Sequence, residues 1–194
     1  MTVLTDKQIQ NNQGIITSLL RSTGRANIEG LIDFMTNQGF FIGPSSKHYH
    51  QSYKGGNAQH SLQVFYNLLA ENDLLLSPLD VDSIIIIGLL HDLCKIDAYV
   101  FTEYITNDQG DIIGQIIESN PNLKDRRHAE KSIDMITKFI VLTDQELLAI
   151  RYHMGIYCQD YSWDEFGKAI RSYPIVYSTH VADMKDTYNM GVRR

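Results

Sequence analysis

The sequence predicts an all-α fold, a helical bundle that carries one small β-hairpin as a decoration. Three observations favour this fold class. Apolar residues recur at helical spacing through most of the chain. Capping residues, glycines and prolines divide these stretches into separate helices. One stretch near the middle of the chain instead alternates around a turn sequence, as the two strands of a hairpin do.

The first predicted helix covers residues 26–40, where large apolar side chains follow helical spacing and glycines come at the end. An irregular stretch, residues 45–57, follows and is rich in His, Tyr, Ser and Gly. Asn57 is expected to cap a second helix over residues 58–70, because asparagine is favoured at that position. His60 then lies in the first turn of this helix.

Residues 82–95 combine two conflicting patterns. Four consecutive isoleucines, Ile84 to Ile87, favour a buried strand by their β-branched side chains. Three leucines that follow extend the apolar run to helical length, so the segment is interpreted as a helix. Ser77-Pro78-Leu79-Asp80 is interpreted as its start, with proline just after a capping residue.

Residues 98–117 alternate between apolar and polar side chains around Asn107-Asp108-Gln109-Gly110, which predicts the hairpin. Beyond it, residues 129–141 carry apolar side chains at helical spacing and form the next predicted helix. Thr143-Asp144-Gln145-Glu146 matches a capping box and opens a helix that is expected to run to His153. A last long helix follows near the end of the chain.

Composition places the chain among globular proteins. Its 194 residues fit one domain, so residues 1–194 are expected to form a single domain. Hydrophobic residues make up 43% and charged residues 21% of the sequence, which indicates neither disorder nor a fibrous repeat. The net charge of −6 argues against a protein whose task is to coat nucleic acid, because phosphate contacts require Lys and Arg.

Two cysteines, Cys94 and Cys158, cannot build a disulfide framework, and they are too far apart for a C-x-x-C motif. A reducing interior is therefore expected. The N-terminus has no apolar signal core, and the longest apolar run, Ile84–Leu90, is too short to cross a bilayer. The sequence predicts a cytoplasmic protein that does not contact the membrane, and leaves a homo-oligomer open.

Side chains that can bind metal recur along the chain at intervals of roughly 25 to 37 residues, about one helix and one connection. This spacing is typical of a metal site built from several helices. The set comprises His60, His91, Asp92, His128, His153 and Asp183. Asp183 lies on the predicted helix over residues 174–190, three residues after His180 and on the same face.

Five ordered motifs resemble those of the HD superfamily of metal-dependent phosphohydrolases, over about residues 49–188. Their order and spacing carry the resemblance more than any single motif does. The motifs are Gly55-Gly56-Asn57-Ala58-Gln59-His60, His91-Asp92-Leu93-Cys94-Lys95, His128-Ala129-Glu130-Lys131-Ser132, Tyr152-His153-Met154-Gly155 and His180-Val181-Ala182-Asp183. Within the superfamily the chain is similar to members with two additional histidines, which are associated with a second metal ion.

The resemblance implies that one metal is held by four residues: His60, His91, Asp92 and Asp183. His128 and His153 would help to hold a second metal, and Asp92 would bridge the two. No glycine flanks His128, whereas relatives often have glycines there, so one or two ions are expected. Imidazole and carboxylate ligands suit Mn, Fe, Co, Ni or Zn, with Mg also open. Hydrolysis of a phosphate ester by metal-activated water is the implied reaction.

Basic residues near the motifs are candidates for contacting the substrate. Lys95 follows Asp92 by three residues, so a helix would point its ammonium group toward the same site, where it would act as a catalytic and phosphate-binding cation. Arg127 and Lys54 are further candidates for substrate phosphate contacts. His48 and His50 are expected to face solvent. His180 is interpreted as a residue that orients a ligand without touching metal.

Three classes of function stay open at this point. The favoured one is a phosphohydrolase that acts on a small phosphorylated substrate, most simply a nucleotide. A 3'-5' exonuclease acting on RNA or single-stranded DNA is the first alternative, although such an enzyme would need stacking aromatics and a basic groove. The third is a nucleotide sensor without activity, or a di-iron oxygenase, on the same scaffold.

Overall fold

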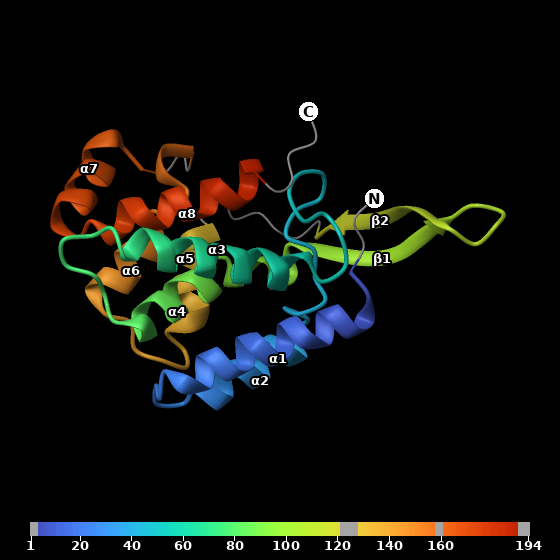
Figure 1. Ribbon diagram of the computed structural model, residues 1–194, viewed down its shortest axis with the longest axis horizontal. Coiled ribbons are helices and arrows are strands. Elements are labelled where there is room, and N and C mark those ends of the chain that lie inside the picture. Colours follow the sequence, from blue (N-terminus) through green and yellow to red (C-terminus); the bar gives the residue numbers. More distant parts are fainter. Residues whose placement is uncertain (1–3, 121–127, 158–160, 190–194) are drawn as a thin grey trace.

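Helices dominate the protein, whose computed structural model describes residues 4–120, 128–157 and 161–189 (Figure 1). The all-α fold class with one hairpin is confirmed. The α-helices are α1 (Asp6–Ser22), α2 (Ile28–Asn37), α3 (Gly56–Asn72), α4 (Val81–Leu90), α5 (His128–Ile136), α6 (Asp144–Arg151), α7 (Trp163–Ser172) and α8 (Ile175–Asn189). Two short 3-10 helices, η1 (Leu93–Asp97) and η2 (Gly155–Tyr157), follow α4 and α6.

The long helix α3 lies between α4 and α8, and α1 packs across α3 and α4 (Figure 1). Apolar side chains lie around the whole circumference of α4, as is typical of a helix in the core of a protein. All four isoleucines from Ile84 to Ile87 are at most 2% exposed. The burial of these side chains accounts for four isoleucines in a helix. The prediction of a helix rather than a strand is confirmed.

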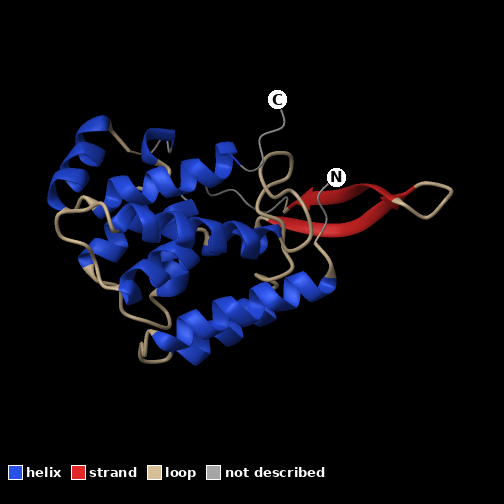
Figure 2. Ribbon diagram, in the orientation of Figure 1, coloured by secondary structure: helices blue, strands red, loops and turns tan. Residues whose placement is uncertain are grey.

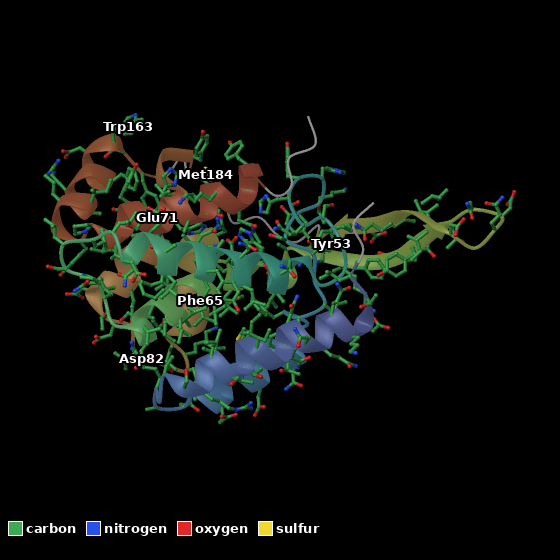
Figure 3. The ribbon with its side chains drawn as sticks, in the orientation of Figure 1. Tyr53, Phe65, Glu71, Asp82, Trp163 and Met184 are labelled. Carbon is green, nitrogen blue, oxygen red and sulfur yellow. The ribbon has the colours of Figure 1, made fainter. Side chains whose placement is uncertain are left out.

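A close approach of α3 and α4 occurs at Gly88. A Cβ atom added to this glycine would lie 2.6 Å from the Cα atom of Phe65, so no larger residue fits without displacing a helix. Phe65, labelled in Figure 3, lies on the side of α3 that faces α4. His91 follows Gly88 by one turn, so this contact helps to bring the end of α4 to the side of α3 that carries His60.

The two strands β1 (Tyr99–Thr106) and β2 (Ile112–Ser119) pair in antiparallel fashion and project from the helical body (Figure 2). Asn107 organises the turn, because its side-chain oxygen accepts hydrogen bonds from the backbone N–H groups of Gln109 and Asp111. Gly110 supplies the left-handed conformation that the turn needs, with φ +85°. The predicted hairpin is confirmed.

Several predicted helix ends were wrong. Asn57 does not cap α3; Gly55 does so, with φ +79°, and Asn57 lies buried inside the helix. Asp80 is the N-cap of α4, so Pro78 precedes the helix rather than opening it. α4 ends at Leu90 instead of continuing to Lys95, and α5 ends at Ile136 instead of residue 141.

The helix opened by Thr143 begins as expected, because both hydrogen bonds of the capping box are present, but it ends at Arg151, before His153. The last helix agrees with its predicted range within the described residues. Sequence analysis missed α1 and α7. Both begin with a capping box, at Thr5 and Ser162, and this pattern would have revealed them.

None of the helices in the described part of the chain combines the length and the apolar character that crossing a bilayer requires.

Candidate metal centre

Six side chains from five parts of the fold converge between α3, α5 and α8. Five of them are almost fully buried, and His128 is 32% exposed. Sequence analysis predicted all six as metal ligands, and the fold brings all six together. They are His60 on α3, His91 and Asp92 between α4 and η1, His128 at the start of α5, His153 in the turn after α6, and Asp183 on α8.

The end of α4 explains how two neighbouring residues, His91 and Asp92, both reach the cluster. In a continuing helix, consecutive side chains point in directions about 100° apart. Here the α-helix stops at Leu90, and Asp92 takes φ −109° and ψ 27° before η1 begins. The chain turns at this point, and both side chains face the same centre.

The first group of candidate ligand atoms surrounds the Nε2 atom of His60. This atom lies 3.2 Å from Nε2 of His91. It also lies 3.3 Å from Oδ2 of Asp92 and 3.4 Å from Oδ1 of Asp183. The ligand-type atoms of His60, His91 and Asp183 lie close enough together to hold a metal ion, and so do those of His91, Asp92 and His153.

The second group contains the other oxygen of Asp92. Its Oδ1 atom lies 3.5 Å from Nε2 of His153 and 3.7 Å from Nε2 of His128, and these two nitrogens lie 3.3 Å apart. Oδ1 is buried and has no hydrogen-bond partner among the described residues. A buried oxygen of this kind needs a partner, and a cation beside the three side chains would satisfy it.

The tautomers of the buried histidines suit metal binding. The Nδ1 atom of each ring contacts an acceptor: Oδ2 of Asp186 at 2.6 Å for His60, the Gly88 carbonyl at 3.0 Å for His91, and the Ile150 carbonyl at 2.7 Å for His153. When Nδ1 donates its hydrogen, the lone pair is left on Nε2. All three Nε2 atoms face the cluster.

Asp186 is part of the site, and sequence analysis missed it. This fully buried carboxylate contacts His60 and also accepts a hydrogen bond of 2.8 Å from Nε2 of Gln51. It follows Asp183 by three residues on α8, so the two aspartates share a helix face. That spacing is the sequence pattern that would have revealed Asp186.

Lys95 lies beside Asp92, with 2.6 Å between Nζ and Oδ2, and its Nζ donates to Oγ of Ser45 at 3.3 Å. The 3-10 helix η1, rather than a continuing α-helix, positions it. Burial lowers the pKa of Lys95, but Asp92 outweighs this effect and raises it above the ordinary value. The side chain therefore supplies a buried positive charge at the cluster.

The charges of the cluster shift its pKa values in both directions. Burial raises the pKa of Asp92, but Lys95 and the surrounding histidines lower it well below the ordinary value. Burial lowers the pKa of His60, yet hydrogen bonds to Asp186 and Asp92 raise it to about 9. Burial lowers the pKa of His128 to about 4. Asp92 is thus an anion at neutral pH, which favours the binding of a cation.

The other predicted substrate contacts have different positions. Lys54 forms an ion pair with Asp6 at 2.9 Å, and no hydrogen bond or ion pair between described residues joins it to the cluster. Arg127 lies outside the described residues. His180 donates from Nδ1 to the His153 carbonyl at 2.8 Å, so it supports the turn that carries a ligand candidate.

His50 does not face solvent as expected. Both ring nitrogens are buried and have no hydrogen-bond partner among the described residues. The ring packs against that of His60 with 4.8 Å between centroids. Burial, together with the positive charge of Lys95, lowers the pKa of His50 to about 3, so the ring is neutral. His48, two residues earlier, is exposed as expected.

A family model for the HD domain matches residues 57–169, more than half of the chain. The chain belongs to the HD domain family. Comparison with curated proteins and with solved structures finds no significant match. HD domains bind divalent metal ions and are generally metal-dependent phosphohydrolases, so this chain carries the domain of a metal-dependent hydrolase. The matched region includes five of the six converging residues, and α8 adds Asp183 beyond it.

Proposed function

We propose that the protein is a metal-dependent phosphohydrolase that cleaves a phosphomonoester or phosphodiester bond, with a nucleotide as the substrate. The single observation that carries this proposal is the arrangement around Asp92. Its two oxygens face two separate groups of histidine Nε2 atoms, as a bridging carboxylate between two metal ions would. Membership of the HD family supports the same reaction class.

In this proposal four residues hold the first ion: His60, His91, Asp92 and Asp183. The second ion is held by Asp92 together with His128 and His153. The ligand set has nitrogen and oxygen atoms but no thiolate, which suits Mn, Fe, Co, Ni or Zn. Divalent ions at these positions would activate a water molecule for attack on phosphorus and would stabilise the charge of the phosphoryl group.

The protein's own side chains contribute the rest of the chemistry. The hydrogen bonds at Nδ1 hold the rings of His60, His91 and His153 in one orientation, so ligand geometry does not have to form during the reaction. Lys95 is placed to neutralise negative charge that develops on phosphoryl oxygens. Because the site is buried, these charges act in a medium of low polarity, which strengthens their electrostatic interactions.

A small substrate fits the charge of the molecule better than a nucleic acid does. The chain has a net charge of −6, and two of its basic side chains, Lys54 and Lys131, form ion pairs with Asp6 and Asp97. A nuclease would need free cations along a groove to bind the phosphate backbone.

Metal analysis and hydrolysis assays of purified protein test the proposal. We expect Asp92→Ala and His91→Ala to lose bound transition metal and the hydrolysis of bis-p-nitrophenyl phosphate. Asp97→Asn is a matched control, because Asp97 is a nearby aspartate whose side chain is 42% exposed and pairs with Lys131. A metal-replete Asp92→Ala protein with full activity would contradict the proposal.

The second ion and the substrate class need separate measurements. His153→Ala should lower the metal content by about one equivalent, and an unchanged stoichiometry would leave only one ion in the proposal. A panel of mononucleotides, nucleoside triphosphates, cyclic dinucleotides and short RNA distinguishes a nucleotide hydrolase from a nuclease. Oxygen consumption by the iron-loaded protein, without hydrolysis of any member of the panel, would favour the oxygenase instead.

A further inference from the structure

His50 lies at the side of the cluster that is open to solvent. The histidines on the inner side, His60, His91 and His153, are fully buried. Exposure begins at His128, whose side chain is 32% exposed, and at Lys95, at 16%. His50 is also intermediate in exposure and packs on the ring of His60. His50, His128 and Lys95 are thus the partly exposed side chains around a cluster that is otherwise buried.

The loop that carries His50 is held in place on both sides of this residue. Oγ of Ser46 donates to the His50 carbonyl at 2.7 Å. The next residue, Gln51, adopts φ +40° and donates from Nε2 to Asp186 on α8 at 2.8 Å. Ser45 donates from its N–H to the Gln51 carbonyl at 3.1 Å, which closes the loop. A non-glycine residue at positive φ indicates that the surroundings fix this conformation.

Although the loop is fixed, the two ring nitrogens of His50 make no hydrogen bond to any described residue. A neutral imidazole has one N–H donor and one acceptor nitrogen, and both are buried without a partner among the described residues. Buried polar groups are nearly always hydrogen-bonded, so an exception beside a cluster of ligand atoms needs an explanation. The ring of His50 packs on that of His60 with 4.8 Å between centroids, so these nitrogens lie beside the cluster.

We infer that His50 is a substrate-contacting residue, which donates a hydrogen bond from its ring to an oxygen of the phosphoryl group that Lys95 also contacts. This inference rests on the proposed function, because it assigns a residue that contacts the substrate of that same site. Two donors of different charge would then bind the phosphoryl group from the protein: the ammonium group of Lys95 and the neutral ring of His50.

His50→Phe is the most informative variant. Phenylalanine keeps a planar ring that can pack on His60 but removes both nitrogens. We expect the Mn²⁺-loaded variant to bind as much metal as the wild type, to melt at the same temperature or higher, and to lose about 100-fold in kcat/KM for bis-p-nitrophenyl phosphate, the usual effect of removing one preorganised donor. A residue that only stabilised the loop would instead lower the melting temperature.

Two further variants complete the test. His50→Gln retains an N–H donor and should recover part of the lost kcat/KM. His48→Phe is the matched control, since His48 lies in the same loop but is exposed, and it should keep wild-type kinetics. The inference is overturned if His50→Phe keeps kcat/KM within twofold of the wild type, or if it loses Mn²⁺.

Binding of inorganic phosphate separates this inference from the proposed function. If the wild-type protein hydrolyses no phosphoester, the proposed function fails, and calorimetry of phosphate binding to the Mn²⁺-loaded protein still tests His50. We expect His50→Phe to bind phosphate at least about tenfold more weakly than the wild type, because a hydrogen bond to a charged group is lost. Equal affinities of the two proteins would overturn the inference.

Discussion

Asp186 makes His60 a stronger base. The contact between Oδ2 of Asp186 and Nδ1 of His60 is 2.6 Å long, and both side chains are fully buried. The negative charge of the carboxylate stabilises the protonated ring and also increases the electron density on Nε2. In the metal-free protein, burial lowers the pKa of His60 but this pair and Asp92 raise it to about 9.

This pKa predicts how metal affinity depends on pH. At pH 7 the metal-free His60 carries a proton on Nε2, and a metal ion must displace it. Affinity for Mn²⁺ should therefore rise as the pH increases from 7 and should level off near pH 9, by up to about tenfold per pH unit for this one proton. Competition with a chelator at each pH measures the effect.

Asp186→Asn tests the origin of this dependence. Without the carboxylate the pKa of His60 should fall, so the rise of affinity with pH should flatten. At pH 9, where the proton no longer competes, the variant should bind Mn²⁺ roughly 10 to 100-fold more weakly, as for other residues that orient a ligand. Asp134→Asn, at an exposed position, serves as the control. An Asp186→Asn protein with the wild-type pH dependence would contradict the assignment.

The positions of single residues could be predicted from the sequence only where a motif marks them. The order and spacing of the motifs were sufficient to predict that these six side chains converge, because each motif could be recognised from neighbouring residues in the sequence. His50 was misplaced because its position depends on how the loop is fixed by Gln51 and Ser46, and no periodicity describes a loop. Asp186 was missed, although its spacing from Asp183 was visible in the sequence.

At the scale of elements, a buried ion pair joins distant parts of the fold. The guanidinium group of Arg25, which lies between α1 and α2, pairs with the carboxylate of Glu146 on α6, which is 0% exposed. The carboxylate also accepts a hydrogen bond of 2.7 Å from Oγ of Ser83 on α4 and one of 2.9 Å from the Thr143 N–H. The capping box of α6 thus also anchors α4 and the N-terminal helices.

Arg25→Ala should lower the free energy of unfolding by about 3–5 kcal/mol, because it leaves the Glu146 carboxylate buried without its cation. Denaturant unfolding measures the change. Arg21→Ala is the matched control: both side chains of the Arg21–Glu29 pair are exposed, so the loss of this pair should change the free energy of unfolding much less. If both substitutions lowered the free energy of unfolding equally, the burial of Glu146 would not determine the contribution of its ion pair.

The contact between α3 and α4 at Gly88 gives a second prediction at this scale. Gly88→Ala should destabilise the protein by about 1–3 kcal/mol, because its Cβ would meet the backbone of Phe65. The same substitution at Gly14, an exposed position of α1 with no atom within 4 Å of the added Cβ, should stabilise it by about 0.5–1 kcal/mol. Thermal unfolding of both variants checks the opposite signs.

Helix starts could be predicted more reliably than helix ends. Thr143 and Glu146 form a local pattern of four residues, and the structure contains both of its hydrogen bonds. The end of α4 at Leu90 has no such pattern, because another fully buried leucine, Leu93, follows at helical spacing beyond it. Tertiary packing decides that end, and with it the turn that places His91 and Asp92 together.

At the scale of the whole molecule, the candidate metal centre connects parts of the chain that are far apart in sequence. His60 and Asp183 are 123 residues apart by their numbers, yet Nε2 of His60 and Oδ1 of Asp183 are 3.4 Å apart. In the metal-free protein, Asp92 and Asp183 place two negative charges among buried histidines. A bound cation would stabilise both carboxylates, and the unfolded chain cannot reproduce this arrangement. Metal binding should therefore stabilise the fold as a whole.

The size of this effect follows from mass action. At a free Mn²⁺ concentration 100-fold above the dissociation constant, one site should add about 2.7 kcal/mol to the free energy of unfolding, or roughly 5–10 °C to the melting temperature. EDTA should reverse the shift. Asp92→Ala, which removes the carboxylate shared by both groups of ligand atoms, should abolish the shift, whereas His153→Ala should retain part of it because only the second group is affected. If Mn²⁺ raised the melting temperature of the Asp92→Ala protein as much as that of the wild type, the ion would bind elsewhere on the molecule.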